Sequence, residues 1–284
     1  MNARMSHLIS TLVALAFASF IYVDHTGLRA MTATKTNPGR SIELNVRSRT
    51  EVFKGSGEWQ DVTTPAKIEP AETAVVICDV WDKHWCKGAT GRCDALAKKI
   101  APVIDNLRSR GVLVIHCPSD CMKFYKDTPQ RAFLLNAPKS ALPVERDIVE
   151  HPLPIDDSDG GCDDQPQCKN YTAWTREHPA IKVAESDGVT DNGVEVYNLM
   201  RLRGIKNLLV MGVHTNMCVL NRTFAIKQMT KWGIRCILVR DLTDTMYNPR
   251  MKPFVLHEQG TELVIRHIEQ YWCPSVDSTQ LMQR

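Results

Sequence analysis

The stretch that most constrains the fold is residues 207–222, where an apolar run ends in a glycine and a short polar loop leads to a cysteine. The run covers residues 208–211, Gly212 follows it, and Cys218 opens a segment with apolar residues at helical spacing. This order predicts a buried parallel strand, a tight turn and the start of a helix. Open α/β sheets bind ligands at the carboxyl ends of their strands, and a helix N-terminus favours a thiolate and an oxyanion. A buried structural cysteine that begins an ordinary helix is the alternative.

A second stretch, residues 74–86, carries a carboxylate in the corresponding place. An apolar run over residues 74–78 ends on Asp79, and a polar loop with aromatic residues follows. An acid directly after a buried strand has no structural role that Asn or Ser could not fill, apart from the capping of a helix. Asp79 is therefore a candidate for chemistry at the same edge of the sheet as Cys218.

Strands and helices alternate along the rest of the chain. A strand, a helix and a strand at these lengths form a βαβ unit, which implies parallel pairing. The sequence predicts an α/β fold with a doubly wound, mostly parallel sheet and helices on both faces, in three layers. The expected strands are residues 73–78, 112–116, 178–185, 208–211, 235–240 and an edge strand at 261–265, and the expected helices are 93–111, 193–203 and 218 to about 232.

Composition bounds the number of domains. With 284 residues and 43% hydrophobic content, the chain can bury a full core, so one domain with extensions is expected. The formal net charge of +3 is small and the basic residues are scattered, which argues against a nucleic-acid surface. The predicted parts are an N-terminal extension with a strand or hairpin (41–72), a main domain (73–273) with an inserted loop (122–170), and a C-terminal tail (274–284).

The inserted loop is rich in proline and in acidic side chains, with five aspartates over residues 155–170 around Gly160 and Gly161. Clustered carboxylates with glycines suit calcium, but their spacing differs from that of an EF-hand loop. A solvated loop pinned by a disulfide is the favoured alternative. A loop of this length suggests a lid or a partner surface.

Residues 1–23 have the pattern of a targeting segment. Arg4 precedes an apolar or small run over residues 8–23, and Ala-Phe-Ala at 16–18 resembles a signal-peptidase site. The run is short for a membrane span, so a signal peptide is favoured over an uncleaved N-terminal anchor, and residues 24–40 follow as a linker. We expect an exported domain, periplasmic or extracellular, with no stable membrane span after processing.

Ten cysteines suit such an oxidising compartment. Zinc is the rival for the cysteine-rich loops, and the lack of a C-x-x-C pair in the sequence disfavours it. The first candidate for a disulfide is Cys162–Cys168, and the others are Cys117–Cys121 and Cys86–Cys93.

Together, the strand that ends in Asp79 and the loop Gly-Val-His-Thr-Asn-Met-Cys-Val resemble the isochorismatase-like cysteine hydrolases, which include nicotinamidases and carbamoyl amidohydrolases. The resemblance runs from about Thr73 to Cys273, with insertions, and the cysteine loop is its specific part. It implies a hydrolase that cleaves a C–N bond of a small amide or carbamoyl substrate through a cysteine thioester, without a cofactor.

The resemblance implies a catalytic triad of Asp, Lys and Cys, in which Asp79 and Cys218 match residue by residue. The cysteine attacks a carbonyl carbon as a thiolate, the aspartate takes and returns the proton, and the lysine holds both anions by its charge. An exposed strand residue is the structural alternative for the lysine candidate. The candidates at the lysine position are Lys182, with Lys83 as a substitute, while Val183 or Glu185 are the residues that could occupy the position instead.

The resemblance further implies an oxyanion hole made by the backbone N–H groups of His214 and Cys218, with a cis peptide bond between Val213 and His214. The expected substrate pocket is lined by Trp81, His84, Trp85, Asn216 and Arg222. Trp81 as a core residue is the alternative, and for Arg222 the alternatives are a substrate carboxylate and an ion pair with Asp241.

A bound metal is not expected, and a divalent ion has only weak candidate ligands in Asp82, His84 and His116. Family members commonly form oligomers, so a homo-oligomer is expected. One rival function is a catalytically silent binding or assembly protein on the same scaffold, because a reactive thiol is at risk in an oxidising compartment. An isochorismatase-type vinyl-ether hydrolase is disfavoured, because that chemistry does not need a nucleophilic cysteine.

Overall fold

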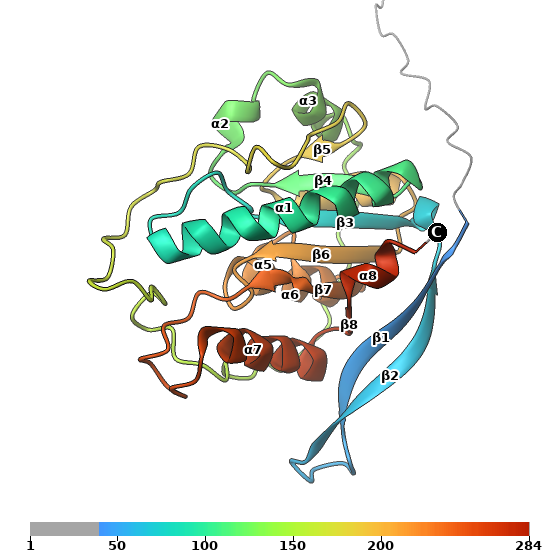
Figure 1. The fold of residues 1–284 in the computed structure, drawn as a ribbon. Helices are drawn as coiled ribbons and strands as arrows, with labels where there is room; N and C mark the ends of the chain where they lie inside the picture. Colours follow the sequence, from blue (N-terminus) through green and yellow to red (C-terminus); the bar gives the residue numbers. More distant parts are fainter. Residues whose placement is uncertain (1–39, 284) are drawn as a thin grey trace, which may run out of the picture. The chain divides into compact units, whose positions relative to one another are not determined.

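Eight strands form one sheet in the computed structural model, which describes residues 40–283 (Figure 1). The strands are β1 (Ile42–Glu51), β2 (Trp59–Ile68), β3 (Thr73–Cys78), β4 (Leu113–Cys117), β5 (Gly188–Val189), β6 (Asn207–Val213), β7 (Arg235–Asp244) and β8 (Ser275–Val276). Their order across the sheet is β2-β1-β8-β7-β6-β3-β4-β5. All neighbours from β8 to β5 pair in parallel, and the β1–β2 hairpin is antiparallel. The predicted mostly parallel sheet is confirmed.

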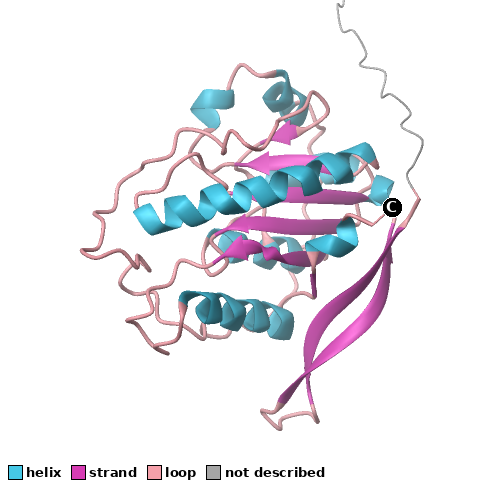
Figure 2. Ribbon diagram, in the orientation of Figure 1, coloured by secondary structure: helices cyan, strands magenta, loops and turns pink. Residues whose placement is uncertain are grey.

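Helices cover both faces of this sheet (Figure 2). Alternate residues of β3 show the two sides: Val75 and Ile77 pack with α1 (Lys87–Ser109), whereas Val76 packs with the helices of the other face. The remaining helices are η1 (Pro70–Glu72), α2 (Met122–Tyr125), α3 (Pro129–Leu135), α4 (Gly193–Leu202), α5 (Cys218–Asn221), α6 (Ile226–Lys231), α7 (His257–Tyr271) and α8 (Ser278–Leu281). Burial on both faces is why the central strands read as continuous apolar runs.

The central strands end at one level. Cys78 at the end of β3 pairs with Cys117 of β4 on one side and with Gly212 of β6 on the other. Gly212 has φ +118°, and a Cβ there would lie 2.0 Å from the carbonyl oxygen of Cys78. Only glycine permits so close an approach of the two backbones. The residues after β3 and β6 are therefore brought to the same edge of the sheet.

The hairpin and the C-terminal residues complete the sheet. β1 and β2 pair from Ile42 with Ile68 to Glu51 with Trp59, as the extension was expected to do. β1 joins the main sheet through β8, where Arg47 pairs with Ser275. Residues 274–284, expected to be a tail, instead supply β8 and α8.

Three expected elements differ from the structure. Residues 261–265 lie in α7 rather than in an edge strand, because Gly260, Val264 and Ile268 repeat at the helical spacing and are buried. Residues 178–185 form an irregular segment, and the strand at this edge is the short β5. The expected helix from Cys218 is split into α5 and α6, because Arg222 adopts an extended backbone conformation with ψ 149°.

The predicted signal segment (1–23) lies outside the described residues, as does the predicted linker (24–40) except for Arg40. Among the helices that the structure describes, none has the length and apolar content needed to cross a membrane.

A buried charge network attaches the irregular segment to the sheet. His116 of β4 lies between two carboxylates, with Nδ1 2.6 Å from Glu177 and Nε2 3.0 Å from Asp187. Arg108 of α1 contacts the same Asp187 oxygen at 2.8 Å. Burial acts to lower the pKa of His116, but the charges of Glu177 and Asp187 outweigh it and raise the pKa to about 9. His116 is therefore a cation between the two acids, and Arg108 supplies a second positive charge at Asp187.

This network predicts a pH dependence of stability. The pKa of His116 is raised in the folded state to about 9, so the protonated imidazole stabilises the folded protein. This contribution to the free energy of unfolding is complete below pH 6.5, the ordinary pKa of histidine. It is lost as the pH rises through the folded value, and the free energy of unfolding is expected to fall by an amount on the order of a few kcal/mol between these limits. Urea unfolding across this range measures the slope. His116→Gln should flatten it, and His151→Gln, outside the network, should leave it unchanged; a steep slope in His116→Gln contradicts the prediction.

Candidate active site

Asp79 directly follows β3 and is completely buried. Its φ of +50° lies in the left-handed region, which costs a residue other than glycine about 1–3 kcal/mol. Two backbone hydrogen bonds hold it there: Asp79 N–H donates to the carbonyl of Cys117 at 3.0 Å, and Trp81 N–H donates to the carbonyl of Asp79 at 2.9 Å. The carboxylate accepts a hydrogen bond of 2.7 Å from the backbone N–H of Ser119. The turn therefore fixes the direction of the carboxylate.

The cation beside Asp79 is Arg222. Its Nε lies 3.1 Å from Oδ2 of Asp79, and its side chain is 36% exposed. A terminal nitrogen of the same guanidinium also lies 3.8 Å from the carboxylate of Asp120. The expected alternative partner, Asp241, instead accepts hydrogen bonds from Ser278. Arg222 therefore forms its ion pair with Asp79 of the site and not with Asp241.

Cys218 begins α5, one helical turn before Arg222, whose backbone N–H donates to the carbonyl of Cys218 at 2.9 Å. Burial and the nearby negative charge of Asp79 raise the pKa of the Cys218 thiol above its ordinary value, while Arg222 and the backbone N–H of His214 act in the opposite direction. Burial and Asp79 therefore act against the thiolate that a helix N-terminus favours. The resting group is a neutral thiol beside a carboxylate.

Asp79 and Cys218 are coupled. Burial raises the pKa of Asp79, and the charge of Arg222 lowers it, as does the Cys218 side chain. Burial opposes the charge of Arg222, but Asp79 and Cys218 more than compensate and raise the pKa of its guanidinium. One buried carboxylate, one neutral thiol and one fixed cation therefore act on each other. This set allows a proton to move from sulfur to carboxylate while the total charge stays near zero.

The loop between β6 and α5 has the backbone form that the resemblance implied. The peptide bond between Val213 and His214 is cis. The carbonyl of His214 accepts hydrogen bonds from the backbone N–H groups of Met217 and Val219, at 3.0 and 3.2 Å. The backbone N–H of His214 acts to lower the pKa of the Cys218 thiol and so favours the thiolate. A backbone donor is therefore present beside the sulfur.

The lysine candidates do not join this set. Lys182 is exposed, and its backbone carbonyl accepts a hydrogen bond from Arg108. Lys83 is also exposed. Over residues 40–283, the ion pairs of Asp79 are made by Arg222 and by no lysine. Glu185, the acid considered for the lysine position, is exposed as well, so no acid replaces the cation. Sequence spacing did hold one signal for Arg222, because residues four apart share a helix face.

Aromatic side chains form a wall near the thiol. Trp81 is buried and stacks on Trp174 with ring centroids 4.2 Å apart, and the ring of His84 lies 5.8 Å from that of Trp174. His84 also contacts His214 edge to face at 4.9 Å. Burial, together with the charge of Arg92, lowers the pKa of His84 to about 4, so the wall is uncharged at neutral pH. Trp174 was missed because it lies in an irregular segment just after the insertion, where the sequence has no periodic pattern.

Asn216 is buried and has a structural role rather than a place in a substrate pocket. It is 1% exposed, and its amide nitrogen donates to Asp157 at 2.7 Å and to the carbonyl of Met246 at 3.1 Å. Its amide oxygen accepts from the N–H of Met246 at 2.9 Å. Because these bonds occupy the amide, Asn216 fastens the acidic insertion to the cysteine loop and is not free to bind a substrate, which corrects the sequence expectation.

A cavity of about 600 Å³ adjoins the aromatic wall. It shares His84 with that wall, but Asp79 and Cys218 do not line it. Trp85, expected in the substrate pocket, lines this neighbouring cavity. The other lining residues come from the start of α1 and from the insertion: Lys83, Lys87, Thr90, Asp164, Gln165, Pro166, Gln167, Cys168, Lys169 and Tyr171.

The weak metal candidates are not assembled in the structure. Asp82 accepts hydrogen bonds from Thr175, His84 lies in the aromatic wall, and His116 is held between Glu177 and Asp187. These three side chains have separate partners and form no common site.

All ten cysteines are free thiols in the structure. The expected disulfide between Cys162 and Cys168 is not formed, and both sulfurs contact Asp164 instead. The other two suggested bridges, Cys117–Cys121 and Cys86–Cys93, are not formed either. Cys117 lies opposite Cys78 in the strand register of the sheet, and Cys86 is the N-cap residue of α1.

The chain matches solved structures at low sequence identity. A cysteine hydrolase from Pseudomonas syringae pv. phaseolicola 1448A is 14% identical with a TM-score of 0.47, covering 76% of this chain and 92% of its own. An isochorismatase from Pseudomonas putida KT2440 is 15% identical with a TM-score of 0.45, covering 75% and 91%. An isochorismatase family protein from Burkholderia thailandensis is 15% identical with a TM-score of 0.43, covering 76% and 98%. Similarity at this level says nothing about the reaction. No protein-family model and no curated protein matches the chain.

Proposed function

We propose that this chain is an isochorismatase-like cysteine hydrolase that cleaves a C–N bond of a small amide or carbamoyl compound through a thioester on Cys218. The observation that carries the proposal is the contact set of Cys218, Asp79 and Arg222 at the carboxyl edge of the sheet. Nucleophile, base and cation lie together there, at the place where open α/β sheets bind ligands. Export through residues 1–23 remains a prediction.

The chemistry begins from the neutral thiol. Asp79 accepts the proton of Cys218 as the sulfur forms a bond to the carbonyl carbon, and the carbonyl oxygen becomes an oxyanion. Asp79 then gives the proton to the leaving nitrogen, the C–N bond breaks, and ammonia or an amine departs. Asp79 next accepts a proton from a water molecule as the oxygen of that water attacks the thioester carbon. The C–S bond breaks, and Asp79 returns the proton to the sulfur of Cys218. Asp79 is thus the single group that moves protons in both halves of the reaction.

Arg222 fills the electrostatic role that the resemblance assigned to a lysine. Its guanidinium stays charged at all working pH values and neither takes nor gives a proton. Its charge opposes the effect of burial on Asp79 and on the thiol, so both anionic forms remain accessible. The departure from the family pattern is therefore a change in the residue that supplies the charge.

Backbone N–H groups would bind the oxyanion. The N–H of His214 acts on the Cys218 thiol and lowers its pKa, and the N–H of Cys218 lies at the first residue of α5. Donors that are fixed before the reaction stabilise developing charge without reorganising. Burial also lowers the pKa of the His214 side chain, to about 3, so the imidazole is neutral and the stabilisation rests on the backbone.

The uncharged aromatic wall favours a small, planar, uncharged substrate. Trp81, Trp174 and His84 stack on one another, and the rings of His84 and His214 carry no charge at neutral pH. An amide or carbamoyl group attached to a flat ring or a short chain would pack against this aromatic stack. A strongly charged substrate would be disfavoured near them because its desolvation would find little compensation.

The test is ammonia release by the full-length protein from a panel of small primary amides and carbamoyl compounds. We expect turnover of some members and its loss in Cys218→Ala, because the thioester cannot form. Cys236→Ala, which removes a buried thiol elsewhere in the core, should keep the activity. Equal turnover in Cys218→Ala would contradict the proposal. No turnover on any member, with a Cys218 that reacts with no electrophile, would favour the silent binding scaffold.

A further inference from the structure

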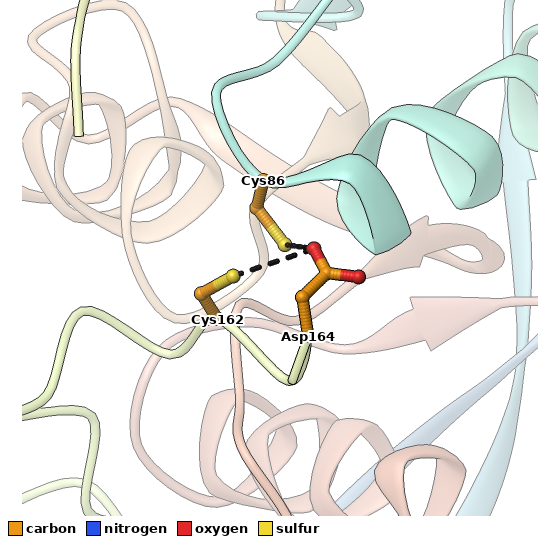
Figure 3. A group of neighbouring side chains, drawn as sticks. All are labelled: Cys86, Cys162 and Asp164. Atoms are coloured by element: carbon orange, nitrogen blue, oxygen red, sulfur yellow. Dashed lines mark hydrogen bonds between the residues drawn. The ribbon is translucent and has the colours of Figure 1, made fainter. Parts of the chain in front are cut away.

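Two thiols and one carboxylate meet at the N-terminus of α1 (Figure 3), and a third thiol, that of Cys168, contacts the same carboxylate. Cys86 caps the helix, and Cys162 and Asp164 reach it from the acidic insertion. The ligand atoms of these three residues all lie within 4.8 Å of one another. One oxygen of Asp164 is 3.2 Å from the sulfur of Cys86, 3.5 Å from that of Cys162 and 3.3 Å from that of Cys168. Soft donors from two distant segments therefore converge on one point.

The spacing fits a tetrahedral metal centre. Zinc binds sulfur at about 2.3 Å and carboxylate oxygen at about 2.1 Å, so neighbouring sulfur and oxygen ligands are about 3.5 Å apart. The three sulfur–oxygen distances here are 3.2, 3.5 and 3.3 Å. Cys86 and Cys162 are completely buried, as structural zinc ligands commonly are. The ligand atoms of Cys86, Cys162 and Asp164 already lie within 4.8 Å of one another. The sulfur of Cys168 lies outside that group, contacts Asp164 at 3.3 Å, and would turn toward the other two sulfurs to complete the site.

The surrounding backbone would stabilise thiolate ligands. Gly88 N–H donates to Asp164 at 3.1 Å, and Ala89 N–H donates to the sulfur of Cys86 at 3.5 Å. These are the free donors of the first turn of a 23-residue helix, whose dipole also favours negative charge. Such hydrogen bonds orient metal ligands and offset the negative charge of a zinc–thiolate group.

We propose that Cys86, Cys162, Asp164 and Cys168 bind one Zn²⁺ ion. Four protein ligands leave no open coordination position, so the ion is structural rather than catalytic. It ties the acidic insertion to the start of α1. A few residues earlier in the insertion, Asp157 accepts a hydrogen bond from Asn216 of the cysteine loop. The ion would therefore also help to hold the insertion beside the catalytic set. This proposal does not depend on the proposed reaction.

The sequence pattern disfavoured zinc because no two cysteines have the C-x-x-C spacing. The structure supplies the ligands from residues 86 and 162–168, which are brought together only by the fold. Cys162 and Cys168 were expected to form a disulfide because they lie close together in the sequence, in a loop without periodicity. A disulfide between two of the three sulfurs would consume the thiolates that the ion needs, so the two states exclude each other.

The first test measures bound metal on the full-length protein, purified under reducing conditions without chelator. Elemental analysis should find about one zinc per chain. Cys162→Ser and Asp164→Asn should lower this several-fold, while Cys236→Ala and Cys218→Ala, both outside the cluster, should retain it. A metal-free protein that takes up no added Zn²⁺ would overturn the proposal. So would a disulfide between two cluster cysteines found by peptide mapping in the freshly purified protein.

A second measurement needs no variant and so covers variants that fail to fold. Co²⁺ added to the metal-free wild-type protein should give intense absorption from sulfur-to-cobalt charge transfer and the visible bands of a tetrahedral ion. Added Zn²⁺ should displace them at one equivalent. Weak octahedral bands, or a spectrum without sulfur charge transfer, would show that the thiols do not bind the metal and would overturn the assignment.

Discussion

Replacing Asp79 with asparagine is expected to lower ammonia release about 10³-fold, because general acid–base catalysis supplies rate factors of 10² to 10⁴. The same change should lower the pKa of the Cys218 thiol, because the charge of Asp79 is among the causes that raise it and Arg222 would then act on the sulfur alone. Alkylation of Cys218 at slightly alkaline pH should therefore become faster while hydrolysis is lost. Iodoacetamide labelling against pH and ammonia release measure the two effects on the same variant.

Asp82→Asn is the matched control. Asp82 lies in the same loop, and its carboxylate accepts hydrogen bonds from Thr175 rather than from the catalytic set. It should leave both the turnover and the acidity of Cys218 close to those of the wild type. Asp79→Asn with full turnover would exclude Asp79 as the base. Slower alkylation in that variant would show that the carboxylate does not oppose the thiolate.

Replacing Arg222 with glutamine is expected to lower turnover at neutral pH by a factor on the order of 100. Without the cation, the buried Asp79 keeps the causes that raise its pKa and loses the main one that lowers it. The base is ionised only above its pKa, so the acid limb of the pH–rate profile should move to higher pH. Arg222→Lys keeps the positive charge but lacks the planar guanidinium group. It should restore part of the activity and return the acid limb of the pH–rate profile most of the way to its wild-type position.

Loss of stability must be separated from loss of chemistry. Arg47→Gln provides the match, because Arg47 pairs with the fully buried side chain of Glu269 at 2.7 Å, in the hairpin contact away from the thiol. Both variants leave a buried acid without its cation, which is destabilising. Only Arg222→Gln should shift the pH–rate profile. An unchanged profile in Arg222→Gln would show that the guanidinium does not act on Asp79 during turnover.

The central strands and two of the reacting residues were predictable from local pattern. β3 and β6 are buried on both faces, so each is a continuous apolar run, and the polar residue after such a run marks the edge of the sheet. Asp79 and Cys218 follow these runs. Their closeness depends on the glycine at 212, which allows the two strand ends to approach.

Sequence spacing favoured Lys182 as the cation, whereas the residue that reaches Asp79 in three dimensions is Arg222. Lys182 had a plausible distance along the sequence, but the segment around it is irregular and the side chain is exposed. Arg222 reaches Asp79 because it lies one turn after Cys218, where the helix ends in an extended residue. The break of that helix has no clear local signal, since no proline or glycine lies between Arg222 and Ile226.

Short apolar runs were the other source of error. Residues 261–265 contain threonine, valine and isoleucine, which favour strands, yet packing against the sheet makes them part of α7. The insertion gave no periodicity at all. Its position follows from tertiary contacts such as Asp157 with Asn216 and Asp164 with the first turn of α1, which no local pattern contains.

The most direct test of the account is to capture the covalent intermediate. The full-length protein is mixed with a substrate from the amide panel, quenched with acid during turnover, and digested for mass spectrometry. The account predicts an acyl group on the sulfur of Cys218, in wild type and not in Cys218→Ala, with the other nine thiols unmodified. An acyl group on another residue, or hydrolysis that proceeds fully without any adduct and persists in Cys218→Ala, would contradict it.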